Sequence, residues 1–108
     1  MAAVHQLEVA TFDQEVKGEA LPVLVEFWSQ TCPHCLQLNP HFEKAAEGAA
    51  GTVKFAKISL QDGAMALFSQ HGVSGVPTLI LFRGGSEVAR RVGATTSDQI
   101  LAWLQQCL

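Results

Sequence analysis

Two cysteines separated by two residues are the feature of this sequence most suited to chemistry. They form the run Cys32-Pro33-His34-Cys35, directly after a segment of apolar residues. Cysteines three positions apart in the first turn of a helix can form a disulfide without backbone movement. A proline suits that turn, because the N–H that it lacks is not needed there. The spacing therefore predicts a reversible disulfide at the start of a helix.

The two sulfurs are expected to differ in reactivity. Cys32, at the helix start, faces unsatisfied N–H groups and the positive end of the helix dipole, which favour its thiolate. His34 adds a donor or a cation close to the same sulfur. Cys35 lies one turn further in and is expected to be more buried, where it can attack a mixed disulfide formed on Cys32. We therefore expect Cys32 to be the nucleophile and Cys35 the resolving thiol.

A pair of cysteines at this spacing also supplies half of many zinc sites. The second half is missing from the sequence. Cys107 lies near the chain end, and His5, His41 and His71 form no second ligand pair. Redox chemistry is thus favoured over metal binding, and we expect no metal or other cofactor.

Composition and length limit the classes of protein to which the chain can belong. The 108 residues, 48% of them hydrophobic, predict one compact domain over residues 1–108. A net charge of −3, with Arg90-Arg91 as the only adjacent basic pair, argues against nucleic acid as a partner. The longest apolar runs, 23–28 and 76–82, are far shorter than the ~20 residues that cross a membrane. The start of the chain has no signal-peptide pattern, so we expect a cytoplasmic protein. We also expect it to be a monomer.

The hydrophobic pattern predicts alternating strands and helices around the cysteines. Pro40 lies inside the longest helical pattern and predicts a kink. Two capping boxes, Thr11 with Gln14 and Thr96 with Gln99, predict helix starts. The expected strands are 7–9, 22–28, 52–58, 78–82 and 87–92, and the expected helices are 11–18, the cysteine motif to about 49, 64–70 and 96–104. The order βαβαβαββα predicts an α/β sandwich with a mixed sheet and an antiparallel final pair of strands.

The residues around the cysteines resemble the thioredoxin family. The resemblance rests on Phe27-Trp28-Ser29-Gln30-Thr31 before the motif and on Gly75-Val76-Pro77-Thr78 later in the chain, and it covers essentially the whole sequence. It implies a thioredoxin fold, with a five-stranded mixed sheet and four flanking helices. It also implies that Pro77 is cis and faces the cysteines, and that Trp28, Val76 and Pro77 contact an extended substrate peptide.

Glu26 is the only charged residue in its apolar strand. Burial of a lone carboxyl raises its pKa, which suits a group that takes the Cys35 proton and returns it. The alternative is a glutamate at the strand edge that reaches solvent. The resemblance supports the first reading, because Glu26 stands where typical thioredoxins have a buried aspartate that serves the resolving cysteine. Lys57 matches the family lysine near that carboxylate.

The dipeptide Pro33-His34 departs from the Gly-Pro of usual thioredoxins. The same motif occurs in a periplasmic disulfide oxidase, but that protein has an inserted helical domain for which 108 residues leave no room. The chain is more similar to the small atypical thioredoxins called desulfothioredoxins. The departure leaves open the redox potential and the direction of electron flow.

We therefore expect a thiol–disulfide oxidoreductase that reduces protein disulfides. It would be re-reduced by a separate thioredoxin reductase, because the chain has no glycine-rich dinucleotide fingerprint. One alternative is a disulfide oxidase or isomerase outside the cytoplasm that uses the same cysteines. Another is a redox-silent binding module that holds a peptide beside Pro77.

Overall fold

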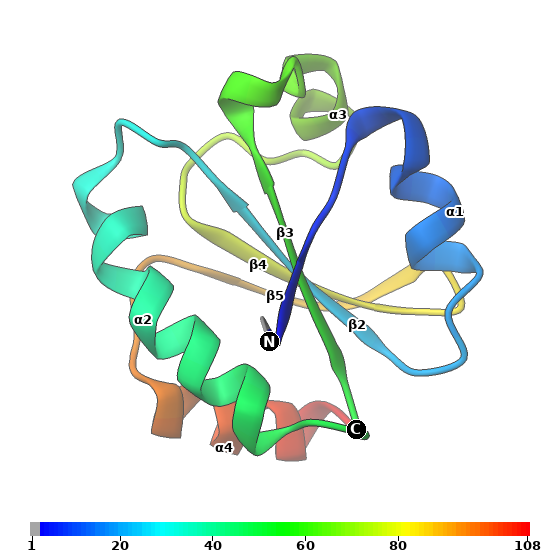
Figure 1. Cartoon of the computed structure of the whole chain (residues 1–108), viewed down its shortest axis with the longest axis vertical. Helices are drawn as coiled ribbons and strands as arrows, with labels where there is room; N and C mark the ends of the chain where they lie inside the picture. Colours follow the sequence, from blue (N-terminus) through cyan, green and yellow to red (C-terminus); the bar gives the residue numbers. More distant parts are fainter. Residues whose placement is uncertain (1–2) are drawn as a thin grey trace.

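The computed structural model describes residues 3–108 and has the predicted α/β architecture (Figure 1). Its main elements are β1 (Val4–Gln6), α1 (Phe12–Lys17), β2 (Val23–Trp28), α2 (Pro33–Gly48), β3 (Lys54–Ser59), α3 (Met65–Gln70), β4 (Thr78–Arg83), β5 (Ser86–Val92) and α4 (Ser97–Cys107). Short 3-10 turns occupy Val9–Thr11 and Leu60–Asp62. The expected order of strands and helices is confirmed.

The five strands form one mixed sheet in the order β1-β3-β2-β4-β5. The first three strands of this order are parallel, whereas β4 runs antiparallel to β2 and to β5. The turn between β4 and β5 contains Gly84 and Gly85, with φ of 60° and 85°. Two adjacent residues of positive φ suit a tight hairpin turn and favour glycine. The predicted hairpin is therefore confirmed.

Helices cover both faces of the sheet. One apolar core contains residues of α2 and α4, and the other contains residues of α1 and α3. Side chains alternate along a strand, so Leu24 belongs to the first core, while Val23 and Val25 belong to the second. Glu26 shares the face of Leu24. The only charged residue of β2 thus lies under the helix that begins at the cysteines.

Two predictions near the N-terminus are wrong. The first strand is Val4–Gln6 and not 7–9, because Leu7 follows it as a buried anchor whose N–H donates to the Lys57 carbonyl at 2.9 Å. The capping box at Thr11 does not form. Thr11 ends a 3-10 turn with φ of −111° and ψ of 0°, and its hydroxyl donates to the Glu8 carbonyl at 3.4 Å. At α4, by contrast, the Thr96 hydroxyl accepts from the Gln99 N–H at 3.2 Å.

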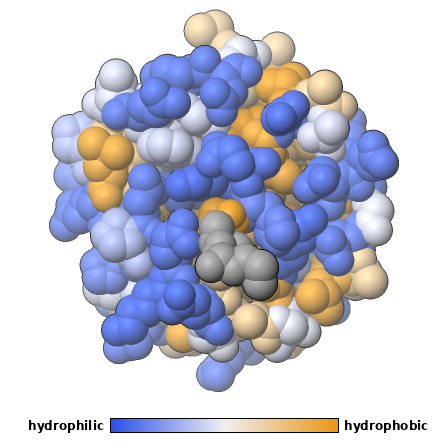
Figure 2. All heavy atoms as spheres, in the orientation of Figure 1, coloured by the Kyte–Doolittle hydropathy of each residue, from blue (hydrophilic) through white to orange (hydrophobic). Residues whose placement is uncertain are grey.

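The long helix α2 begins with Pro33 in its first turn and continues through Pro40. Leu36, part of the apolar pattern of the sequence, is 52% exposed and lies outside the core. No helix among residues 3–108 is long and apolar enough to cross a membrane. The face shown in Figure 2 is mostly hydrophilic, with apolar side chains in separate patches.

Candidate redox site

The two cysteines of the motif are free thiols at the N-terminus of α2. Cys32 is the N-cap residue, and its Sγ accepts a hydrogen bond from the Cys35 backbone N–H at 3.2 Å. Cys32 is partly exposed, whereas the Cys35 side chain is fully buried. The difference in exposure expected from the helix start is therefore present.

Burial is the main influence on the Cys35 thiol. Together with the hydrogen bond to Cys32, burial raises the pKa of Cys35 to about 12. A thiol with this pKa is protonated at neutral pH, and only a thiolate attacks a disulfide. Cys35 therefore needs a nearby base before it can react.

The loop before β4 faces the Cys32 sulfur. The Val76–Pro77 peptide bond is cis, as the family resemblance implied, and the Cys32 thiol donates to the Val76 carbonyl at 3.7 Å. The Thr78 hydroxyl donates to the Gly75 carbonyl at 2.6 Å and closes the loop. The Gly93 N–H donates to the Pro77 carbonyl at 2.9 Å. The loop is thus held from both sides while it contacts the cysteine.

Glu26 is 0% exposed in the middle of β2. Its neighbours across the sheet are Lys57 on β3 and Leu79 on β4. Burial raises the pKa of Glu26 to about 8; the charge of Lys57 opposes this rise, and Glu43 on α2 adds to it. The alternative of a glutamate that reaches solvent at a strand edge is wrong. A carboxyl with a pKa near 8 can gain and lose a proton near neutral pH.

Lys57 and Trp28 lie beside Glu26. The Lys57 Nζ is 5.1 Å from the centroid of the Trp28 ring, within the range of a cation–π contact. Trp28 is buried at the end of β2, and its Nε1 has no hydrogen-bond partner within the described part of the chain. The lysine is therefore held near the carboxyl by an aromatic face.

Asn39 is a neighbour of Glu26 that the sequence analysis did not identify. The amide is assigned with its nitrogen, rather than its oxygen, toward Glu26 and the Cys35 carbonyl, because only that assignment gives both amide atoms hydrogen-bond partners. In this orientation Nδ2 donates to both Glu26 carboxylate oxygens, at 3.2 and 3.1 Å, and to the Cys35 carbonyl at 3.1 Å. The signal was available, because Asn39 follows Cys35 by four residues and so lies on the same helix face.

Gln61, also missed, connects the loop before Cys32 to the end of β3. Its Oε1 accepts from the Gln30 N–H at 2.9 Å and from the Ser59 hydroxyl at 3.0 Å. Its Nε2 donates to the Ser29 hydroxyl at 2.9 Å. No spacing pattern marks Gln61, because its partners come from another strand end. The network holds the segment that leads to Cys32.

His34 lies exposed in the first turn of α2. The group on the helix that contacts the Cys32 sulfur is the Cys35 N–H rather than the imidazole. The effect of His34 on the Cys32 thiolate stays a prediction.

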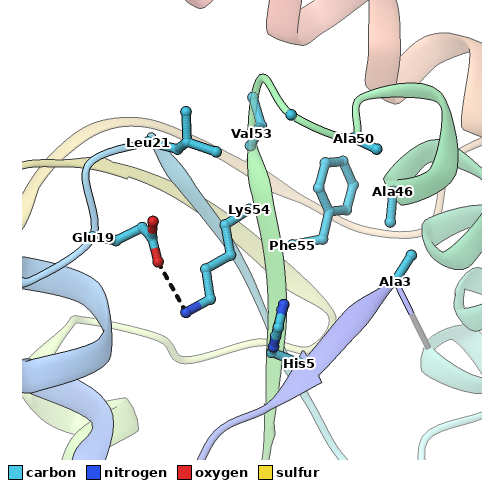
Figure 3. A pocket seen from close by; sticks show the side chains of 10 residues that line it. Ala3, His5, Glu19, Leu21, Ala46, Ala50, Val53, Lys54 and Phe55 are labelled. Carbon is cyan, nitrogen blue, oxygen red and sulfur yellow. Dashed lines mark ion pairs between the residues drawn. The ribbon is translucent and has the colours of Figure 1, made fainter. Parts of the chain in front are cut away.

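A hollow of about 330 Å³ lies at the start of β3, where Lys54 is located (Figure 3). Its charged residues Glu19 and Lys54 pair at 3.2 Å, as the dashed line in Figure 3 marks. Cys32 follows the opposite end of the parallel strands β2 and β3, so this hollow is remote from the thiols. Within residues 3–108, no group of three or more His, Cys, Asp or Glu side chains could hold a metal ion.

Comparison with known proteins agrees with this geometry. The family model described as Thioredoxin matches residues 3–106. Thioredoxin 1 of Nostoc sp. is 36% identical over 104 residues, which cover 94% of this chain and 96% of that protein. A thioredoxin of Alicyclobacillus acidocaldarius is 37% identical over 106 residues, 98% of this chain and 99% of that protein. A thioredoxin of Synechocystis sp. is 32% identical over 108 residues, the full length of both. The chain therefore belongs to the thioredoxin family of thiol–disulfide oxidoreductases.

Proposed function

We propose that the protein reduces disulfides in other proteins through a reversible disulfide between Cys32 and Cys35. The observation that carries the proposal is the arrangement at the start of α2. A partly exposed sulfur accepts a hydrogen bond from the N–H of a fully buried cysteine, at 3.2 Å. Members of this family work with their dithiol and no further cofactor.

The proposed reaction has two exchange steps. The Cys32 thiolate attacks one sulfur of the substrate disulfide, and the other substrate sulfur leaves as a thiol after taking a proton. The Cys35 thiol then gives its proton to the Glu26 carboxylate and attacks the Cys32 sulfur as a thiolate. The second substrate sulfur leaves as a thiolate and takes the proton back from Glu26, which regenerates the carboxylate. Two electrons pass to the substrate, and the protein retains a Cys32–Cys35 disulfide. Lys57 stabilises the Glu26 carboxylate before the proton arrives.

Substrate is proposed to bind beside the cis peptide bond. The Val76 carbonyl faces Cys32, and Pro77 follows it. A hollow of about 420 Å³ adjoins Val76, lined in part by Leu60 and Met65. An extended peptide whose cysteine meets Cys32 can place its backbone on Val76 and an apolar side chain in this hollow. Trp28, 9% exposed at the end of β2, would contribute only its exposed edge to the contact with substrate.

We propose that a separate thioredoxin reductase restores the dithiol. A steady supply of reduced Cys32 and Cys35 requires a reducing compartment, so we place the protein in the cytoplasm. We propose that it acts there as a monomer. We further propose that the chain is one of the small atypical thioredoxins with a Cys-Pro-His-Cys motif, on the basis of Pro33-His34.

Reduction of insulin tests the proposed function. With dithiothreitol as electron donor, the wild type should precipitate the insulin B chain many-fold faster than dithiothreitol alone. Cys32→Ser should match the rate of dithiothreitol alone. Cys107→Ser serves as the control, because Cys107 lies at the far end of α4, and it should keep the wild-type rate. A wild-type rate no higher than that of Cys32→Ser would favour a redox-silent binding module.

A further inference from the structure

Asn39 lies about one helical turn after Cys35 on α2, and its side chain contacts the buried carboxyl of Glu26 on β2. An amide nitrogen has two hydrogens, and Asn39 directs them at three acceptors within 3.2 Å. One hydrogen is shared by the two Glu26 oxygens, and the other reaches the Cys35 carbonyl. The same side chain therefore donates hydrogen bonds to the Glu26 carboxylate and to the backbone carbonyl of Cys35.

Among the charges around Glu26, only that of Lys57 favours the ionised carboxylate, so a hydrogen-bond donor would add to its stabilisation. Lys57 on β3 is the cation that faces Glu26 across the sheet, while α2 presents the Glu43 carboxyl and the Cys35 thiol, and Leu79 on β4 is apolar. Burial works against the carboxylate, and so does Glu43. A hydrogen bond donated to a carboxylate favours the charged form, which alone can accept a proton.

Glu26 also needs orientation. A glutamate side chain has three rotatable torsions, and a base must lie in a defined direction to take a proton. Contacts from one donor to both oxygens remove the freedom of the last torsion. The same amide nitrogen also donates to the Cys35 carbonyl, which links the orientation of the carboxylate to the backbone of the buried cysteine.

We propose that Asn39 is a positioning residue that holds the Glu26 carboxylate in its proton-accepting form and ties it to the Cys35 backbone. The proposal rests on the proposed function for its role in turnover, but the contact with Glu26 can be tested without it. Asn39 is not a catalytic residue, because Glu26 stands between it and the transferred proton.

The first test is a carbon-13 titration of the Glu26 carboxyl in the reduced protein, with its resonance identified by its loss in Glu26→Gln. Asn39→Leu keeps the volume of the side chain and removes both hydrogens. We expect it to raise the Glu26 pKa by about one pH unit, the effect of one hydrogen bond to a charged group. Gln37→Leu is the matched control, because Gln37 is an exposed amide on the same helix, and it should leave the titration unchanged. If Asn39→Leu does not fold, Asn39→Ala makes the same comparison.

The second test measures how fast the mixed disulfide is resolved, from pH 6 to 9. In the wild-type background, Asn39→Leu should shift the pH profile of the resolution rate to higher pH. In the Glu26→Gln background, it should have no further effect. A Glu26 titration that Asn39→Leu leaves unchanged, or an equal effect of Asn39→Leu in both backgrounds, overturns the proposal. If the wild type resolves no mixed disulfide, the proposed function fails, whereas the carbon-13 titration still decides the role of Asn39.

Discussion

The backbone nitrogen of Cys35 donates a hydrogen bond to the Sγ of Cys32 over 3.2 Å. The donor belongs to the main chain, so it is present with any residue other than proline at position 35. Cys35 therefore has two separable roles. Its backbone N–H stabilises the Cys32 sulfur, and its side chain is expected to attack the mixed disulfide. Substitutions at the two positions should therefore have different effects.

Cys35→Ser should keep a reactive Cys32 and lose the resolving step. We expect it to accumulate a covalent mixed disulfide with substrate proteins, which mass spectrometry would detect as the sum of the two masses. Cys32→Ser should form none, because the remaining Cys35 sulfur is buried. Adducts on Cys32→Ser in place of Cys35→Ser would reverse the two assignments.

Glu26→Gln should stabilise the fold at and above neutral pH. The folded state raises the pKa of Glu26 from 4.5 to about 8, so between these values the folded state binds more protons than the unfolded state. The free energy of unfolding therefore falls as pH rises through this window. From pH 5 to 9, the wild type should lose on the order of 4 kcal/mol more stability than Glu26→Gln, at about 1.4 kcal/mol per pKa unit.

Urea unfolding at a series of pH values checks this prediction, with Glu47→Gln as an exposed control on α2. Parallel profiles for the wild type and Glu26→Gln would show that Glu26 is ionised as easily in the fold as outside it. The base role proposed for Glu26 also requires that Glu26→Gln slow the release of the mixed disulfide. Equal turnover at every pH from 6 to 9 would remove that role.

His71 should make the fold sensitive to acid. Its ring centroid lies 5.3, 5.9 and 5.5 Å from those of Phe12, Phe27 and Phe82, and its Nε2 has no partner among the described residues. Burial lowers the pKa of His71, against the charges of Asp13 and Glu87, while Arg90 lowers it further.

The sign of the effect follows from this lowered pKa. As pH falls below about 6.5, the unfolded chain takes up a proton on His71 before the folded chain does, so stability decreases with acid. His71→Phe should flatten the curve of unfolding free energy between pH 7 and 5. His5→Gln, an exposed histidine change on β1, should leave the wild-type slope. Equal slopes for the wild type and His71→Phe would contradict the burial argument.

Apart from the first strand, which lies at Val4–Gln6 and not at 7–9, the strands, the helices and the thiol pair could be predicted from the sequence because they depend on local patterns. Glu26 was found for the same reason, as one charge in an apolar run. No sequence pattern marks His71, and only the packing of α1 and β4 shows that its ring lies among aromatic side chains. The spacing of Asn39 from Cys35 places it on the same helix face, but its contact with Glu26 on β2 depends on how α2 packs on the sheet. Gln61 acts through partners on other elements, which a linear pattern does not contain.

Replacing Pro33-His34 by Gly-Pro should make the protein a stronger reductant. The change removes an imidazole donor from the first turn of α2, and with it part of the stabilisation of the Cys32 thiolate in the reduced form. We expect the reduction potential to fall by roughly 20 to 50 mV, at about 30 mV per 1.4 kcal/mol for two electrons. A potential unchanged within about 10 mV, measured against glutathione, would show that this dipeptide does not set it.

Equilibrium redox titration of the wild type shows whether Cys32 and Cys35 form a reversible disulfide at the potential of a reductant. Thiol labelling and mass spectrometry at each potential should show Cys32 and Cys35 oxidised together, in a two-electron transition at about −220 to −250 mV. A midpoint near the roughly −120 mV of a strong disulfide oxidase would contradict the proposed reductase. The absence of any Cys32–Cys35 disulfide across the titrated range would contradict redox function altogether.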